Sequence, residues 1–169
     1  MSKYIRTTKE CSVNQLHPEL LRAIQNHFQE HALGHLQAET IACCETISKR
    51  KSASEKISWL SGKPDTIIHT GMLLTSQWLI WVHYGDRSGI RLNAANLSEI
   101  RTEFLKSLFT KDASLEIVGY ISNAKARVRG TIALGPDLAA EKFCEAVKEA
   151  IHKANPPKPN KPFKWLSGG

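Results

Sequence analysis

The sequence predicts a mainly β protein of the α+β class, with one helix before and one helix after about seven short strands. Runs rich in β-branched and aromatic residues, separated by turn residues, recur between residues 36 and 134 and indicate the strands. Helical spacing of apolar residues is clear at 18–33 and 138–154. Because helices and strands do not alternate, a doubly wound parallel sheet is not expected.

The first helix is predicted over residues 18–33. Pro18 suits its first turn, where the missing N–H costs little. Leu20, Ile24 and Phe28 then recur at every fourth position and form an apolar stripe. The first element is therefore expected to be an amphipathic helix.

The next segments change in character. Residues 36–47 mix small, β-branched and acidic residues, a composition that favours a half-buried strand. A long connection follows over residues 48–65, in which Ser52 and Glu55 have the spacing of a capping box and indicate a short helix.

A tight antiparallel hairpin is predicted from residues 67–74 and 78–84, which flank a short polar turn. The second arm is apolar at odd and at even positions, so we expect it to be buried on both faces. Residues 97–109 are expected to form a strand that passes into an irregular or helical turn. Further strands are predicted at 88–92, 115–122 and 127–134.

The second helix, over residues 138–154, is the clearest element of the sequence. Gly135 and Pro136 stop the preceding strand, and Asp137 has the residue type preferred at a helix N-cap. Apolar residues then form one stripe among charged ones. Prolines after residue 155 break the helix and begin a tail that favours polyproline structure.

Three segments carry a family resemblance. They are residues 73–82, a Leu-Thr turn leading into an aromatic and aliphatic strand, residues 89–92, and residues 128–134, which run into the second helix. Together they resemble the bacterial pleckstrin-homology-like domains, over residues 36–154. This resemblance implies a seven-stranded antiparallel bent barrel, capped by a C-terminal helix and here preceded by an additional N-terminal helix.

The chain is accordingly divided into three parts. Residues 1–35 form a polar segment, expected to be irregular up to residue 15, and the first helix. Residues 36–154 form the pleckstrin-homology-like domain, and residues 155–169 form a basic, proline-rich tail. The tail contributes +3 of the formal net charge of +7, a basic balance that can favour anionic partners.

A basic cluster follows the first predicted strand. It comprises Lys49, Arg50 and Lys51, with Lys56 and Lys63 later in the same connection. In pleckstrin-homology domains that bind phosphoinositides, the corresponding loop supplies basic residues, so the resemblance implies an anion or lipid-headgroup site here. A solvated run of charge at a barrel edge is the competing interpretation.

The tail holds a second candidate site, formed by Phe163, Lys164, Trp165 and Leu166. A segment that combines cations with aromatic residues suits a groove on a partner protein, a neighbouring subunit or an anionic membrane interface. A disordered end is an equal alternative. Nucleic acid is not a favoured partner, because one Trp and one Phe make a poor stacking platform.

The sequence predicts no metal site and no cofactor. His27, His31 and His35 have helical spacing, but the Glu of a metalloprotease motif is missing and a solvated helix face is favoured. The four cysteines lack C-x-x-C spacing and are expected to be reduced, mostly buried thiols. The adjacent pair, Cys43 and Cys44, would lie on opposite faces of a strand.

No catalytic residues are predicted either. The chain has no G-x-S-x-G turn, and residues 61–64 lack the hydroxyl residue and upstream glycine of a phosphate-binding loop. The favoured function is therefore non-catalytic, namely recognition of an unidentified protein or peptide, or self-association as a homo-oligomer. The alternative is binding to anionic phospholipid or a membrane surface through the basic loop and tail, and a small-molecule enzyme is the third hypothesis.

A cytoplasmic location is expected. The longest strongly apolar run, residues 72–84, contains several polar residues and is shorter than the roughly 20 residues of a spanning helix. The first residues lack the apolar stretch of a secretory signal.

Overall fold

The computed structural model describes residues 3–51, 64–107, 112–122 and 124–156. Along the chain, one strand is followed by two helices, then by seven strands, and finally by a long helix. The strands are β1 (Tyr4–Glu10), β2 (Ala42–Arg50), β3 (Ile67–Leu74), β4 (Trp78–Gly85), β5 (Gly89–Asn96), β6 (Ile100–Lys106), β7 (Ala113–Gly119) and β8 (Val128–Leu134). The helices are α1 (Pro18–Glu30), α2 (Leu36–Glu39) and α3 (Leu138–Ala154), with 3-10 turns at Val13–Gln15 and Leu97–Glu99.

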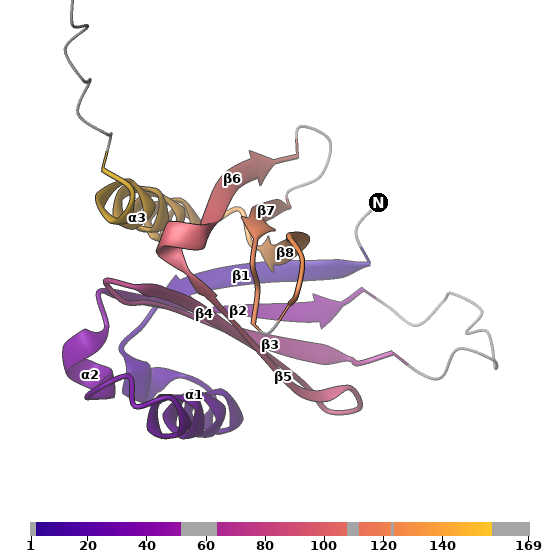
Figure 1. The fold of residues 1–169 in the computed structure, drawn as a ribbon. Coiled ribbons are helices and arrows are strands. Elements are labelled where there is room, and N and C mark those ends of the chain that lie inside the picture. The colour runs from indigo at the N-terminus through magenta and orange to yellow at the C-terminus, as the bar shows by residue number, and fades with distance from the viewer. Residues whose placement is uncertain (1–2, 52–63, 108–111, 123, 157–169) are drawn as a thin grey trace, which may run out of the picture.

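These elements form layers around a central sheet (Figure 1). The described strands make a five-stranded antiparallel sheet in the order β1-β2-β3-β4-β5 and a three-stranded sheet in the order β6-β7-β8. Helices α1 and α2 lie on one face of the five-stranded sheet, and α3 lies with the smaller sheet on the other (Figure 1). The mainly β prediction with a C-terminal helix is confirmed.

The prediction of seven strands in a barrel is wrong in two respects. The described residues contain eight strands, and the strands of the two sheets do not pair with each other, so the barrel is not closed. Seven strands, β2 to β8, lie within the expected segment, and the eighth is β1, from residues expected to be irregular. Strand β1 pairs antiparallel with β2 along its whole length.

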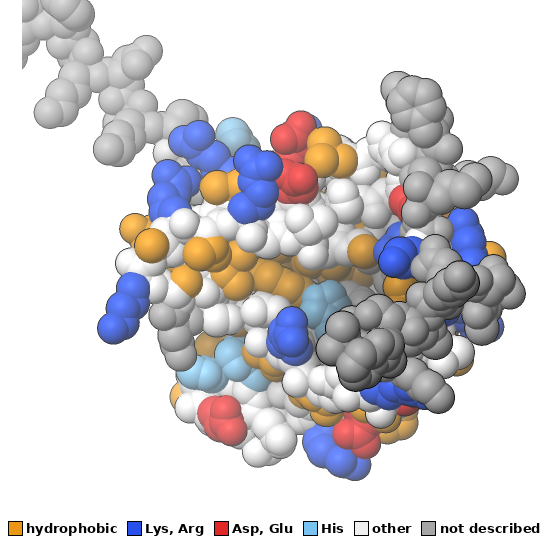
Figure 2. Space-filling view, turned by 90° about the vertical axis from the view of Figure 1, so that its right-hand side faces the viewer, with side chains coloured by type: hydrophobic (Ala, Val, Ile, Leu, Met, Phe, Trp, Pro, Cys, Tyr) orange, Lys and Arg blue, Asp and Glu red, His pale blue; other side chains and the backbone are white. Residues whose placement is uncertain are grey.

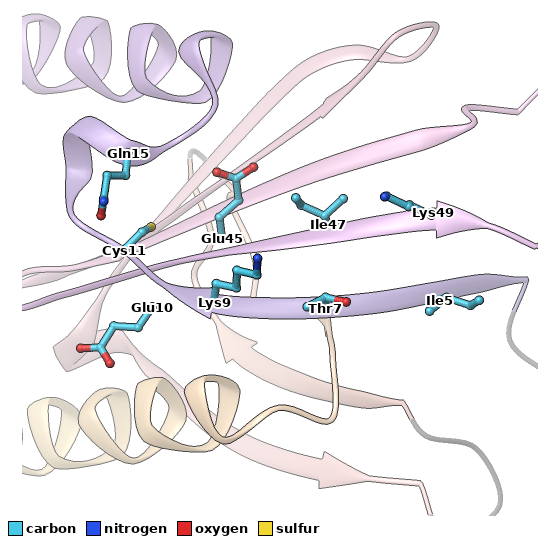
Figure 3. Close-up of a pocket in the computed structure, with 9 residues that line it drawn as sticks. All are labelled: Ile5, Thr7, Lys9, Glu10, Cys11, Gln15, Glu45, Ile47 and Lys49. Carbon is cyan, nitrogen blue, oxygen red and sulfur yellow. The ribbon is translucent and has the colours of Figure 1, made fainter.

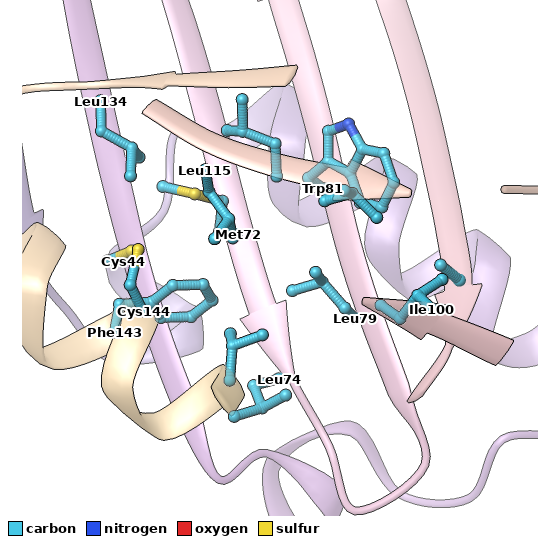
Figure 4. Close-up of a cluster of buried hydrophobic side chains, with 14 of the residues drawn as sticks. Cys44, Met72, Leu74, Leu79, Trp81, Ile100, Leu115, Leu134, Phe143 and Cys144 are labelled. Carbon is cyan, nitrogen blue, oxygen red and sulfur yellow. The ribbon is translucent and has the colours of Figure 1, made fainter. Parts of the chain in front are cut away.

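Strand β4 is buried on both faces, as the sequence predicts. Leu79 and Trp81 point into the core between the two sheets and α3 (Figure 4). Ile80 and Val82 point to the other side, where α1 packs through Leu20, Ile24 and Phe28. One strand thus joins the two hydrophobic cores of the molecule.

Three other segments differ from expectation. Helix α1 ends at Glu30, before the expected end at residue 33, and Gly34 follows with φ of +90°. Residues 36–39 form the helical turn α2, so the strand predicted from residue 36 begins at Ala42 instead. In residues 97–109 the turn comes first, and strand β6 follows it. The short helix expected near Ser52 lies outside the described residues.

Polar contacts hold β1 against the chain that enters α3. The Asp137 carboxylate accepts a hydrogen bond from the Thr8 backbone N–H at 2.6 Å. The Thr8 hydroxyl accepts one from the Gly135 N–H at 2.9 Å and bonds the Thr46 hydroxyl at 2.7 Å. A side chain at Gly135 would collide with the β1 backbone and with Asp137. Asp137 is the N-cap residue of α3, as predicted, but its carboxylate binds β1.

A buried carboxylate organises the turn between β4 and β5. Asp65 is 6% exposed and accepts hydrogen bonds from the backbone N–H groups of Arg87 and Ser88, at 2.6 and 3.1 Å. Burial alone would raise the pKa of Asp65, but the Ser88 hydroxyl and these N–H groups lower it from 3.8 to about 2. The Tyr4 hydroxyl donates to the Asp65 carbonyl, which connects this turn to β1.

Replacing Asp137 tests the attachment of β1. Asp137→Ser keeps a good N-cap residue but removes the acceptor for the Thr8 N–H, so we expect a loss of about 1–3 kcal/mol in the free energy of unfolding. Urea denaturation measures it. Glu145→Ser, exposed on the same helix, should change the free energy by less than about 0.5 kcal/mol. Equal effects of the two substitutions would contradict this role of Asp137.

Lowering the pH tests the Asp65 contact. Because its folded pKa lies below the ordinary value, the charged carboxylate stabilises the fold above pH 4, and this stability is lost as the pH falls from about 4 to 2. The wild type should lose about 2 kcal/mol relative to Asp65→Asn across that range. Urea denaturation at several pH values measures the difference. Parallel stability curves for the two proteins would show that Asp65 does not titrate in this way.

Candidate functional site

The face of the five-stranded sheet that carries α1 is only partly covered by described residues. Helix α1 contacts β3, β4 and β5. Strands β1 and β2 extend past it and leave an open groove of about 460 Å³ beside the helix (Figure 3). The groove is lined by Ile5, Thr7, Lys9 and Glu10 of β1, by Cys11 and Gln15 after it, and by Glu45, Ile47 and Lys49 of β2.

Strand alternation brings the odd-numbered side chains of β1 and β2 to one face. Antiparallel pairing places Ile5 opposite Lys49, Thr7 opposite Ile47, and Lys9 opposite Glu45, and directly opposite residues share a face. Figure 3 shows the Lys9 side chain rising into the groove, whereas Glu10 is directed toward α3. Apolar and cationic side chains therefore share the groove.

Glu45 fixes the inner end of the groove. Its carboxylate bonds the His69 ring at 2.7 Å and accepts a hydrogen bond from the backbone N–H of His17 at 3.0 Å. The His17 ring stacks on Tyr84, with the ring centroids 4.9 Å apart. These contacts attach the start of α1 to β2, β3 and β4. The Glu45 carboxylate thus has partners within the protein and is not the group left for a ligand.

Beside Glu45 the groove wall contains a thiol pair. The Cys11 and Cys43 sulfur atoms are 3.8 Å apart, and Cys11 is half-buried while Cys43 is buried. Cys44 points to the opposite face and packs in the core with Cys144. The prediction of opposite faces for the adjacent cysteines is confirmed, and all four cysteines are free thiols.

The structure separates the predicted basic cluster. Lys49 lines the groove, Arg50 is directed to the opposite face of β2 by strand alternation, and Lys51 is exposed just after the strand. Lys56 and Lys63 lie outside the described residues. On the face shown in Figure 2, cationic side chains are scattered around a band of hydrophobic ones and do not form one patch.

The tail site cannot be placed in the fold. It lies outside the described residues, which end at residue 156. Phe163, Lys164, Trp165 and Leu166 therefore remain a prediction from the sequence.

The structure brings together two of the three histidines of the predicted helix face and separates the third. His27 and His31 have ring centroids 4.4 Å apart and line a second cavity of about 380 Å³ with Trp78. Burial, and then the neighbouring His31, lower the pKa of His27. His35 lies beyond the end of α1 and precedes α2. The described residues contain no group of three or more His, Cys, Asp or Glu side chains arranged to hold a metal ion.

Sequence reasoning missed most of the groove. Ile5, Thr7 and Lys9 belong to β1, in a segment whose sequence predicts irregular structure, and Ile47 belongs to a predicted strand that carries no predicted site. The β-branched residues at positions 5, 7 and 8 were the available signal for β1.

Among the described helices, none combines the length and the apolar character that a membrane span requires. In comparisons with known proteins, no family model, no curated protein and no solved structure matches this chain. Its function has to be inferred from the fold and the groove themselves.

Proposed function

We propose that this protein is a non-catalytic binding module that recognises a peptide or protein segment through the groove over β1 and β2. The carrying observation is an apolar strip, formed by Ile5 and Ile47, with a lysine on each side of it. Ile5 is 60% exposed in a strand, so its burial by a ligand would remove apolar surface from water.

The charges of the groove define the ligand further. Lys9 and Lys49 are exposed, and neither forms an ion pair with a carboxylate in the described ranges. Lys49 lies opposite Ile5, so the two lysines are offset by four residues, or about 13 Å along the strands. Side chains at positions i, i+2 and i+4 of an extended segment point to the same side, so acidic residues at i and i+4 with an apolar residue at i+2 match this spacing.

The fold supports placing this groove on a pleckstrin-homology-like core. Strands β2 to β8 and α3 supply two antiparallel sheets followed by a helix, as the resemblance implies, although the two sheets do not close into its barrel. Strand β1 is an addition to that core, and the groove is lined by β1, by Cys11 and Gln15 after it, and by β2 of the core. We therefore assign the recognition function to the place where the added strand β1 pairs with core strand β2.

A membrane surface is the second candidate, supported by a row of residues across three strands that shares Ile5 and Lys49 with the groove. Ile5, Lys49 and Ile67 are directly opposite neighbours on β1, β2 and β3. All three are exposed. Exposed apolar side chains beside a cation suit the boundary of an anionic bilayer.

A labelled peptide tests the first proposal. The probe is an extended peptide with the core Asp-Thr-Ile-Thr-Asp, which presents both Asp and the Ile on one side, and a peptide with Lys in place of both Asp is its control. We expect the acidic peptide to bind more tightly in fluorescence anisotropy. The double substitution Lys9→Glu, Lys49→Glu should weaken binding at least about tenfold, because attraction becomes repulsion.

The matched control for the Lys9→Glu, Lys49→Glu variant is Lys125→Glu with Lys148→Glu. These two lysines are exposed and lie away from the groove, so the control changes the net charge by the same amount. Equal loss of binding in both variants would show that the overall charge of the protein, and not the groove lysines, determines peptide binding. Equal binding of the acidic and basic peptides would refute the proposed ligand chemistry. Light-scattering mass at the same concentrations separates self-association from peptide binding.

Vesicle co-sedimentation tests the second candidate. If the row formed by Ile5, Lys49 and Ile67 contacts lipid, vesicles of phosphatidylcholine with phosphatidylserine should capture the full chain at low salt and release it as salt rises. Ile5→Ser with Ile67→Ser should then abolish capture. Capture that these substitutions leave unchanged would exclude the row as the membrane contact.

A further inference from the structure

The thiol pair in the groove wall has the geometry for chemistry beyond ligand binding. Continuing the β1–β2 register past Glu10 and Cys44 places Cys11 directly opposite Cys43, and the Cys11 N–H donates to the Cys43 carbonyl at 3.2 Å. Directly opposite residues in antiparallel strands have Cα atoms about 4.5–5.5 Å apart, within the range that a disulfide spans. With sulfurs 3.8 Å apart, side-chain rotation suffices to join them.

The two thiols differ in access. Cys11 lines the groove and is half-buried, so a small molecule can reach its sulfur from solvent. Cys43 is 5% exposed and lies directly behind Cys11. Cys44 and Cys144 are buried in the core between the sheets and α3. Cys11 is thus placed to react first with a molecule from solvent. Cys43 is placed to attack the Cys11 sulfur afterwards and displace the group bound to it.

The electrostatics agree with this order. The hydrogen bond from Cys43 lowers the pKa of the Cys11 thiol, against the opposing effects of burial and of Glu45. The same hydrogen bond, followed by burial, raises the pKa of Cys43. Burial also raises the pKa of Cys44, and that of Cys144 to about 12. Since the thiolate is the nucleophile, Cys11 is the favoured attacking group.

We propose that Cys11 and Cys43 form a thiol–disulfide exchange site for small disulfides of the glutathione type. The Cys11 thiolate attacks one sulfur of the disulfide, forms a mixed disulfide and releases one small thiolate. Cys43 then attacks the Cys11 sulfur, gives its proton to the first released thiolate, and expels the second small thiolate, which takes up a proton from water to replace the one that the Cys11 thiol lost on ionisation. In total the protein loses two protons and two electrons, and the small disulfide gains them as it is reduced to two thiols.

The product would cross-link the end of β1 to the start of β2. The closed loop contains the whole of α1 and α2, so the bond restricts the unfolded chain and raises the unfolding temperature. This reaction does not depend on what the groove binds. Its failure and the failure of the peptide proposal are therefore separate results.

Oxidised glutathione is the probe, applied to the full chain, with rapid alkylation of the remaining thiols and peptide mass mapping. We expect a Cys11–Cys43 cross-link in the wild type, with loss of two free thiols. Cys43→Ala, which keeps a small apolar side chain at a buried position, should accumulate the mixed disulfide at Cys11. Cys11→Ser should form neither product.

Cys44→Ala is the matched control, because it changes the adjacent cysteine on the opposite face and should cross-link like the wild type. The oxidised wild type should unfold on the order of 5 °C higher than the reduced protein, and oxidised Cys43→Ala should not. Equal modification of Cys11 and Cys44, or a Cys43→Ala variant without the mixed disulfide, would overturn the proposal.

Discussion

The arrangement of this protein depends on one constraint: β4 is apolar on both faces, so the five-stranded sheet has to be covered on both sides. The smaller sheet and α3 cover one side together. On the other side the described residues cover the sheet mainly with α1, a helix of 13 residues, and with the short helix α2. A helix about 10 Å in diameter spans two to three strands at their spacing of about 4.8 Å. The groove over β1 and β2 is what remains of that face.

The sequence was informative where burial is strong and local. Strand β4 and helix α3 have periodic apolar patterns that reflect their own surroundings, and both were predicted close to their observed bounds. Strand β1 was missed because it is a polar edge strand whose attachment comes from distant partners. Thr8 is held by Asp137, Gly135 and Thr46, none of which is near it in the sequence.

The candidate site shows the same division. Lys49 was selected as part of a run of positive charge, but strand alternation separates it from Arg50 and sets it beside side chains from β1. The groove arises from pairing between β1 and β2 across the intervening α1 and α2. Likewise, the Cys11–Cys43 contact follows from register alone, and the lack of C-x-x-C spacing concealed it. Local sequence motifs do not indicate contacts between residues that are far apart in the sequence.

The attachment of β1 also bears on aggregation. An edge strand ordinarily offers a row of unpaired N–H and C=O groups that another chain can extend into a continuous intermolecular sheet. Here the Asp137 carboxylate accepts a hydrogen bond from the outward-facing Thr8 N–H. The backbone at Gly135 lies close to β1 at the same point and occupies the space beside this strand. A foreign strand would have to displace both before it could add at this point. The segment that precedes α3, with Gly135 and Asp137, therefore blocks the edge of β1 sterically and by hydrogen bonding, and so opposes edge-to-edge association of this strand.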